Sequence, residues 1–318
     1  MSPQQCIRRV GTLETQQQGV AVVTALLLTT LAITIVASLF WQQQVQVRSI
    51  ENQRLQLQKQ WVLRGALDWA RLILREDGRN SEIDDLSEPW AIPLAPTRLD
   101  RYVESANISA EAGSAVLSGV IEDAQGRFNL TNLATQGNIN RSEVDAFARL
   151  LKLLRQDPAL AMAVAQHVAL IGKTTITPQP DLARPLGLVQ VDDLLALPGF
   201  DPGIISTLRP HTIVLPTTSP LNVNTAGPEL LAAKVTGLSL TDAISMTTHR
   251  QQSPFLAVAN FIQRLPSAAS GVDSNSLSVT SSFFLANGSV SIRNVKLEVQ
   301  ALIERQPTAT RLLWVRAL

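Results

Sequence analysis

The sequence of 318 residues has little charge, a single cysteine and only three histidines. Charged residues make up 17% of the chain and hydrophobic residues 45%, whereas globular domains carry about 25% charged residues. This composition excludes a disordered chain, and it requires either extra buried core or a membrane segment. The formal net charge of +1 also argues against general electrostatic attraction to nucleic acid or anionic lipid.

The scarcity of reactive side chains argues against an enzyme. Cys6 has no second cysteine with which to pair. None of the histidines has the spacing of a metal site or of a nucleophile and its base: His167, His211 and His249. Gly172-Lys-Thr is similar to the end of a phosphate-binding loop, but such a loop needs a glycine where His167 stands and a strand before it. We expect His167, in an apolar helix, to be a buried or half-buried structural residue.

One apolar segment near the N-terminus accounts for part of the missing charge. No charged residue occurs between Glu14 and Arg48, and 17 of the 22 residues from Val20 to Trp41 are apolar. A helix of 22 residues is about 33 Å long, which is enough to cross the hydrocarbon core. A secretory signal peptide would have a shorter apolar region that ends in an A-x-A-like site. The sequence therefore predicts one transmembrane helix.

The basic residues before this segment predict its orientation. Arg8-Arg9 precede it and no basic run follows closely, so the N-terminus is expected in the cytoplasm and the bulk of the chain across the membrane. A twin-arginine export signal is a weaker alternative, because ten residues separate the pair from the apolar stretch.

A single helix is expected to continue beyond the membrane. No proline occurs from Val20 to Glu88. In the last part of this stretch apolar residues recur every three or four positions, which is the pattern of a helix with one apolar face: Val62, Leu63, Ala66, Leu67, Trp69, Ala70, Ile73 and Leu74. We expect one helix to about Glu76, with a polar middle (42–60) and an apolar stripe that needs a partner surface.

The rest of the chain alternates between strand and helix patterns. After an acidic loop (76–88), three prolines keep the chain extended, and residues 101–110 and 115–130 are expected to form a strand hairpin. Helices are expected at residues 142–154, 158–171, 191–197, 201–208, 228–235, 241–250 and 256–265. A final antiparallel strand with one solvent-facing side is predicted by apolar residues from Val295 to Ile303, which alternate with Lys296, Glu298, Gln300, Leu302 and Glu304. This order predicts a helical domain inserted into a small sheet domain.

Three phrases carry a family resemblance. They are Asp84-Asp-Leu-Ser-Glu-Pro-Trp-Ala91, Glu122-Asp-Ala-Gln-Gly-Arg-Phe-Asn-Leu-Thr-Asn-Leu133 and Leu221-Asn-Val-Asn-Thr-Ala226, the last followed by a leucine-rich helix. Together with Gly19-Val20 at the start of the apolar run, they resemble the K-type minor pseudopilins of bacterial type II secretion (general secretion pathway protein K). The resemblance covers nearly the whole chain.

The resemblance implies an α+β, pilin-like fold. A long N-terminal helix would pack on a small antiparallel sheet, and a large inserted all-α domain would contain helix-hairpin-helix or SAM-like motifs. The expected parts are a prepilin leader (1–19), a transmembrane helix (20–41), the helix continuation with the first part of the pilin-like domain (42–131), the inserted α-domain (132–275) and the C-terminal strands that complete the sheet (276–318).

The resemblance also implies processing, location and partners. A prepilin peptidase would cut between Gly19 and Val20, which would remove Cys6, and Val20 would be N-methylated. The mature chain would cross the inner membrane once, with its C-terminal domain in the periplasm, and would join the periplasmic pseudopilus. The implied role is assembly initiation at the pseudopilus tip, in a hetero-oligomer with the I- and J-type minor pseudopilins. Other implied partners are the remaining pseudopilins and the inner-membrane secretion platform.

Thr24 bears on the position at the tip. It is the fifth residue counted from Val20, where most pilin-like proteins have a glutamate that is thought to pair with the N-terminal amine of the subunit above. An unpaired carboxylate is costly in the membrane, so a topmost subunit gains nothing from it. The hydroxyl of Thr24 can bond to its own helix instead. The alternative is that threonine is merely tolerated, as at Thr29, Thr30 and Thr34.

The inserted block offers a competing interpretation. The stretch from Asn222 through Gly237 to Arg250 is similar to helix-hairpin-helix modules, whose backbone amides bind DNA phosphates. A membrane-anchored binding module, or a type IV minor pilin for DNA uptake, is therefore the alternative function. Residues 185–275 contain four basic and six acidic residues, a net charge of −2, whereas DNA binding needs the opposite sign. We expect no nucleic-acid partner.

Calcium is the one cofactor considered, because the family has been associated with it, and no cofactor is required. Acidic loops supply the oxygen ligands that calcium prefers. The densest acidic cluster comprises Asp77, Glu82, Asp84, Asp85 and Glu88. These residues match no fixed ligand spacing, and a solvated loop is the other meaning of such a run.

Overall fold

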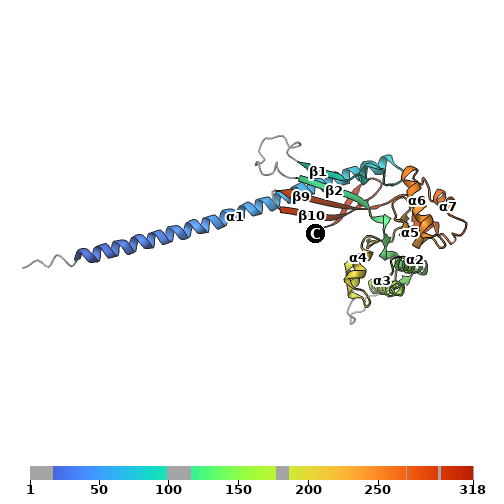
Figure 1. Cartoon of the computed structure of the whole chain (residues 1–318), viewed down its shortest axis with the longest axis horizontal. Coiled ribbons are helices and arrows are strands. Elements are labelled where there is room, and N and C mark those ends of the chain that lie inside the picture. The colour runs from blue at the N-terminus through green and yellow to red at the C-terminus, as the bar shows by residue number, and fades with distance from the viewer. Residues whose placement is uncertain (1–16, 99–115, 177–185, 270, 293–294, 318) are drawn as a thin grey trace, which may run out of the picture. The chain divides into compact units, whose positions relative to one another are not determined.

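The structure is a computed structural model that describes residues 17–98, 116–176, 186–269, 271–292 and 295–317. The chain divides into two units, Met1–Gln58 and Lys59–Leu318. Helix α1 (Gln17–Asn80) begins in the first unit and continues into the second (Figure 1). The prediction of one helix to about Glu76 is therefore confirmed, although the helix ends four residues later.

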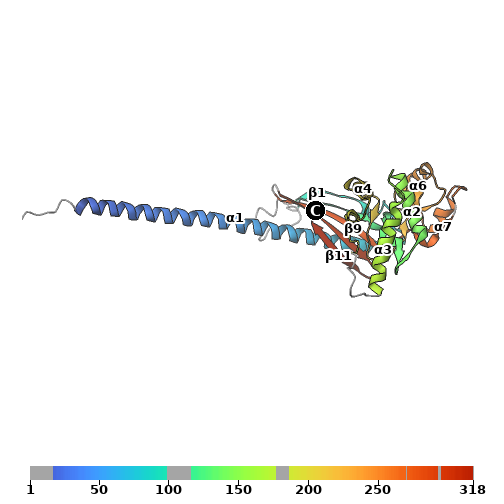
Figure 2. The same ribbon diagram turned by 90° about the horizontal axis from the view of Figure 1, so that it is seen from below.

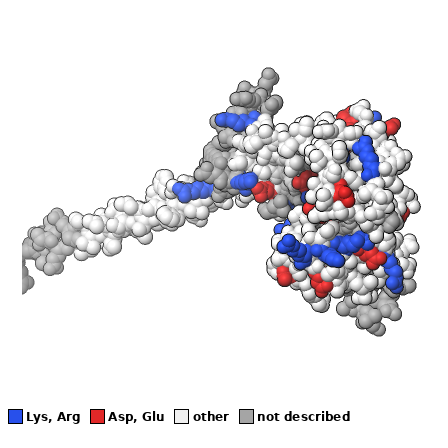
Figure 3. Space-filling view, turned by 45° about the vertical axis from the view of Figure 1, so that its right-hand side comes forward, with Lys and Arg blue, Asp and Glu red and all other residues white. Residues whose placement is uncertain are grey.

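The first unit consists, in its described part, of α1 from Gln17 to Gln58. Residues Val20–Ile50 form a stretch of 31 residues that is long and apolar enough to cross a membrane. No coloured side chain interrupts the beginning of this helix in Figure 3, where lysine, arginine and the acidic residues are coloured. The transmembrane prediction agrees with this exposed apolar surface.

A five-stranded antiparallel sheet organises the second unit. Its strands have the order β1-β2-β9-β10-β11, and their bounds are β1 (Leu94–Arg98), β2 (Val116–Asp123), β9 (Phe283–Ile292), β10 (Val295–Arg305) and β11 (Thr310–Ala317). Strands β2 and β9 pair along their length although the helical block lies between them in the sequence (Figure 1). The predicted strand at 115–130 ends at Asp123, and the predicted strand at 101–110 lies outside the described residues.

The C-terminal part of α1 covers one face of this sheet, as the apolar stripe predicts. Leu67, Ala70 and Leu74 pack against Phe284 and Ile303 in one buried cluster. Trp90 belongs to the same cluster and meets the Phe284 ring edge-on, with 5.2 Å between the centroids. The stripe therefore finds its partner surface within the chain.

The block between β2 and β9 is helical at nearly every predicted place. Its α-helices are α2 (Arg141–Leu153), α3 (Leu160–Ile176), α4 (Pro202–Leu208), α5 (Pro228–Lys234), α6 (Leu240–Gln252) and α7 (Val258–Gln263). Its 3-10 turns and short strands are η4 (Ala124–Gly126), β3 (Phe128–Asn129), η5 (Leu130–Leu133), β4 (Ala134–Thr135), β5 (Asn138–Ile139), η6 (Val191–Ala196), β6 (Thr212–Ile213), β7 (Leu221–Asn222), η7 (Ser274–Ser276) and β8 (Leu277–Ser278), and η1 (Pro89–Ala91) precedes β1. The helix predicted at 191–197 is thus a 3-10 turn.

The helical block has its own core and conventional helix starts. Thirty buried residues form one cluster, which includes Phe147, Leu231 and Phe261. Asp201 caps α4 by accepting a hydrogen bond from the Ile204 amide at 2.9 Å, and proline follows at the first helical position, where its missing N–H costs nothing. Figure 2 shows α2, α3 and α6 gathered at one end of the sheet.

The prediction of a solvent-facing side on β10 is wrong at Leu302. Lys296 is exposed, but Leu302 on the same side is fully buried. It packs with Leu285 of the sheet and with Ile213 and Leu215 of the helical block. The block therefore covers one end of the second sheet face, which an alternating pattern alone cannot reveal.

Candidate functional site

The three phrases of the family resemblance meet in one buried polar cluster. We call it the junction cluster and define it as Asp84, Asp123, Asn222, Ser281 and Arg305. The Asn222 amide nitrogen donates to the Asp84 carbonyl at 3.0 Å, to Asp123 Oδ2 at 2.9 Å and to Ser281 Oγ at 3.0 Å. Asn222 is completely buried. It thereby ties the loop after α1 to the end of β2 and to the segment before β9.

Asp123 is the centre of this cluster. Its Oδ2 accepts from Ser281 Oγ and from Thr225 Oγ1, both at 2.6 Å, and its Oδ1 accepts from the Gln125 amide at 2.8 Å. Burial raises the pKa of Asp123, and these hydrogen bonds offset part of that rise. Asp123 is the N-cap residue of η4, so its bond to the Gln125 amide also caps this turn.

Arg305 is the cation of the junction cluster. Its Nη1 donates to Asp77 Oδ2 at 2.6 Å, and its Nη2 donates to Asp84 Oδ1 at 2.6 Å and to the Ser281 carbonyl at 2.8 Å. The guanidinium also lies 4.8 Å from the centre of the Phe284 ring. One cation thus serves two carboxylates, both almost without solvent contact.

The two carboxylates have raised pKa values. Burial raises the pKa of Asp77 to about 7, with further contributions from Glu88 and Asp84, and the nearby Arg305 offsets only part of the rise. Burial likewise raises the pKa of Asp84 to about 6, against the opposing effect of Arg305. The cluster therefore changes its proton content between weakly acidic and neutral pH.

The sequence analysis missed Arg305 and Ser281. Arg305 follows Val299, Ala301 and Ile303 at the same parity on β10, so a charge stands where the pattern demands an inward-facing apolar side chain. That mismatch is a detectable signal of a buried ion pair. Ser281 carries no such signal, because serine in a loop is ordinary.

The acidic residues proposed as calcium ligands separate into two groups. Carboxylate oxygens of Asp77, Asp84 and Glu88 lie within 4.8 Å of one another. Glu82 is exposed, and Asp85 accepts hydrogen bonds from the Ser87 amide and hydroxyl, both at 2.6 Å. The first group offers the hard oxygen donors that calcium requires, but Arg305 already neutralises two of its members. The loop is therefore partly an ordered ion-pair site rather than a solvated run.

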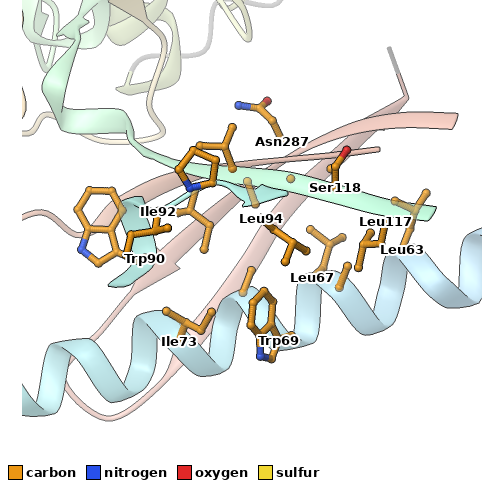
Figure 4. Close-up of a pocket in the computed structure, with 18 of the residues that line it drawn as sticks. Leu63, Leu67, Trp69, Ile73, Trp90, Ile92, Leu94, Leu117, Ser118 and Asn287 are labelled. Atoms are coloured by element: carbon orange, nitrogen blue, oxygen red, sulfur yellow. The ribbon is translucent and has the colours of Figure 1, made fainter. Parts of the chain in front are cut away.

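An apolar groove of about 320 Å³ lies between α1 and the β1–β2 side of the sheet. Figure 4 shows Leu67, Trp69 and Ile73 rising from the helix toward Leu94 of β1. Trp69 is 49% exposed and Ile92, at the rim, is 66% exposed. The groove is therefore an apolar opening beside the helix–sheet core, and none of the described residues that line it is charged.

The predicted processing residues lie in the apolar part of α1. Gly19 and Val20 are helical, and Val20 is exposed. Thr24 Oγ1 donates to the carbonyls of Val20 and Ala21, each at 3.0 Å, which confirms the expected bond to its own helix. Thr34 makes the same kind of bond to the Thr30 carbonyl at 2.7 Å, so this geometry alone does not distinguish the role of Thr24.

The residues that prompted the other interpretations have structural roles. His167 is half-buried in α3, 3.1 Å from the Leu186 carbonyl, as expected. Gly172 lies inside α3 and not after a strand, and a Cβ there would approach the Gly137 amide to 2.7 Å. Gly237 has a φ of +82°, and a Cβ there would lie 2.2 Å from the Ala268 carbonyl oxygen. Close backbone packing accounts for both glycines.

Comparison with known proteins agrees with the resemblance. Two models of type II secretion system (T2SS) protein K match the chain, one over residues 126–217 and one over residues 221–280. A type II secretion system protein K from Pseudomonas aeruginosa is 27% identical over 314 residues, which is 91% of this chain and 89% of the relative.

A solved structure shares the fold. It is the crystal structure of the GspK-GspI-GspJ complex from the enterotoxigenic Escherichia coli type 2 secretion system, one chain of which matches with a TM-score of 0.62 and 18% identity. The match covers 85% of this chain and 99% of that chain. Of the junction cluster, Asn222 lies within the range matched by the second model, and so does Thr225, which also bonds Asp123. By its sequence matches the chain is thus similar to protein K of type II secretion systems.

Proposed function

We propose that this minor pseudopilin occupies the tip of the type II secretion pseudopilus and initiates its assembly together with the I- and J-type minor pseudopilins. The related solved complex contains a K chain with an I and a J chain, which supports these partners. The apolar helix Val20–Ile50 supports a single-pass anchor in the inner membrane, with the second unit in the periplasm. The chain acts in this proposal through assembly and not through catalysis.

The observation that carries the tip position is the absence of any carboxylate from the apolar segment. Between Thr15 and Val47 the sequence has no charged residue, and Thr24 satisfies its hydroxyl within its own helix. A subunit inserted below another would gain from a carboxylate that neutralises the amine above it, because an unpaired ammonium in hydrocarbon is costly. A first subunit has no such amine to neutralise.

The helical block is consistent with the same position. Residues 124–282 are inserted between neighbouring strands β2 and β9, and the described part of this range includes six α-helices. Such a volume would collide with a subunit stacked directly above, whereas it is unobstructed at the end of a fibre. The block is thus expected to prevent growth on its own side.

Co-elution tests the assignment. The part of the chain from about Gln44 onward, mixed with the soluble parts of the I- and J-type pseudopilins of the same system, should elute from a sizing column as one ternary complex at micromolar concentration. Three separate peaks would exclude the proposed assembly. Retention of the same fragment on a DNA column at moderate salt would instead favour the alternative of a DNA-binding module.

Processing at Gly19-Val20 is a second part of the proposal. After coexpression with a prepilin peptidase, the intact mass of the chain should correspond to a start at Val20 with one added methyl group. A chain that still carries Met1 would contradict this. The changes Gly19→Ala and Ala21→Gly form a matched pair, because only the first should block cleavage after residue 19.

Calcium binding near Asp77, Asp84 and Glu88 stays a prediction. If calcium binds there it must compete with the Arg305 guanidinium, since the two cations would share the carboxylates. Thermal unfolding with calcium and with a chelator is the direct measurement. An unchanged Tm would remove calcium from the description.

A further inference from the structure

The two edges of the sheet differ in their capacity to accept another strand. Edge strand β1 has five residues, contains Pro96 and follows Pro93. Proline removes an amide donor and is a usual means of blocking an edge. Edge strand β11 has eight residues and neither proline nor glycine. No described strand pairs with its outer side, which can be followed in Figure 2.

A bulge gives β11 a particular set of side chains on one face. Trp314 pairs with Leu302 and Arg316 with Gln300, whereas the register shifts so that Leu312 pairs with Ile303 and Arg311 with Glu304. In a regular strand, residues three positions apart, such as Arg311 and Trp314, would lie on opposite faces. Here Leu313 is the extra residue of the bulge and has no partner on β10. The bulge instead places Arg311, Trp314 and Arg316 together on the face opposite α1.

Neither arginine of this face forms an ion pair with a described acidic residue, although Glu304 lies directly opposite Arg311 across the β10–β11 pair. Arg316 donates to Gln190 Oε1 and to the Val189 carbonyl, each at 3.1 Å. Its guanidinium lies 4.1 Å from the centre of the Trp314 ring, which holds it in place by a cation–π contact. Because these partners are neutral, no acidic group compensates the charge of Arg316. Arg311 is exposed.

A groove of about 430 Å³ borders this face of β11, where the sheet meets the helical block. Ile213 and Leu285 belong to its apolar lining. Two further arginines line it, but each has a carboxylate at 2.5 Å: Arg127 pairs with Glu122 and Arg209 with Asp192. Arg316 is therefore the groove's unpaired positive charge among the described residues.

We propose that an extended acidic segment of the I- or J-type partner adds to the free edge of β11, with a carboxylate on Arg316 and an apolar side chain in the adjoining groove. This inference rests on the proposed complex with those partners. Strand addition uses main-chain hydrogen bonds for affinity and alternate side-chain contacts for specificity. The charge of Arg316 selects an acidic occupant, and the two arginines disfavour pairing between two copies of this edge.

Charge reversal on β11 tests the inference. The wild-type soluble chain, the Arg311→Glu/Arg316→Glu variant and an Arg141→Glu/Lys152→Glu control are each titrated with the I- and J-type soluble domains. The control makes the same charge change at exposed positions of α2, which contributes nothing to the groove. We expect Kd to rise about tenfold or more for the β11 variant only, and its dependence on salt to weaken.

Hydrogen exchange on the wild-type chain gives a readout that needs no variant. Amides of residues 311–316 should exchange more slowly in the complex than in the free chain. Binding by the wild type with unchanged exchange there, or equal Kd values for the two variants, would overturn the β11 site and leave the proposed function intact. Absence of wild-type binding would overturn both. If the arginines served only to prevent self-association, the Arg311→Ala/Arg316→Ala variant would dimerise and bind the partners unchanged.

Discussion

At the scale of single residues, we expect Asn222 to make a large contribution to the free energy of unfolding. It is buried completely and joins Asp84, Asp123 and Ser281. Asn222→Ala should lower the free energy of unfolding by about 3 kcal/mol, because buried acceptors lose their donor. Urea unfolding of the soluble chain measures this, with the exposed Asn260→Ala as control. A loss below about 1 kcal/mol would mean that water replaces the amide.

The two carboxylates that Arg305 binds predict how stability depends on pH. Asp77 and Asp84 have pKa values of about 7 and about 6 in the folded chain, against the ordinary aspartate value of 3.8. The folded state therefore binds more protons between these values, so their contribution to stability is complete below about pH 4 and is lost as pH rises through 6 and 7. The change Asp77→Asn removes one of these two titrating groups. The Tm of the wild type minus the Tm of Asp77→Asn should therefore be larger at pH 5 than at pH 8. A difference independent of pH would contradict the raised values.

The sequence marks several residues of the junction cluster but does not predict that they come together. Asp84, Asp123 and Asn222 stand inside the three phrases that marked the family, whereas their convergence depends on contacts between residues 99 and 138 positions apart. Arg305 was available as an inward-facing charge on an otherwise apolar strand side. Ser281 could not be predicted, because nothing in the nearby sequence distinguishes a serine that will donate to a distant carboxylate.

At the scale of elements, local periodicity predicts the helices, but it does not predict which strand faces are covered by the rest of the chain. Leu302→Ala should cost about 3 kcal/mol of unfolding free energy, since the side chain is fully buried against Leu285 and Ile213. Gln300→Ala, on the same side of the same strand but only half-buried, is the matched control and should cost less than about 1 kcal/mol. Equal small effects would restore the prediction of a solvent-facing side.

The physical reason for the mismatch is that burial of a sheet face depends on what covers it. An alternating pattern reports one apolar side, and β10 has that side against α1. The helical block adds a second cover at one end, where Leu302 lies. Likewise the short strands β3–β8 of two residues each carry no periodicity to detect, because they form only where they pair with one another in two-stranded sheets.

At the scale of the whole molecule, the tip position makes a prediction about assembly. Thr24→Glu should still be cleaved and should give no increase in the number of pseudopili, because a first subunit has no amine above it for the carboxylate to neutralise. Counting fibres by electron microscopy in cells that express the variant in place of the wild type measures this. Thr29→Glu is a control for the cost of a carboxylate in the same helix. A marked gain in initiation with Thr24→Glu would contradict the tip position.

Arg305 also bears on the order in which the chain can fold. It bonds Asp84 across 221 residues of sequence, and the helical block lies between the two. During synthesis from the N-terminus to the C-terminus the acidic loop therefore emerges long before its counter-charge. Contacts of such separation form late, so the sheet is completed only after the block has been synthesised. The ion pair of Arg305 therefore forms late, when the sheet closes around a block that is already in place.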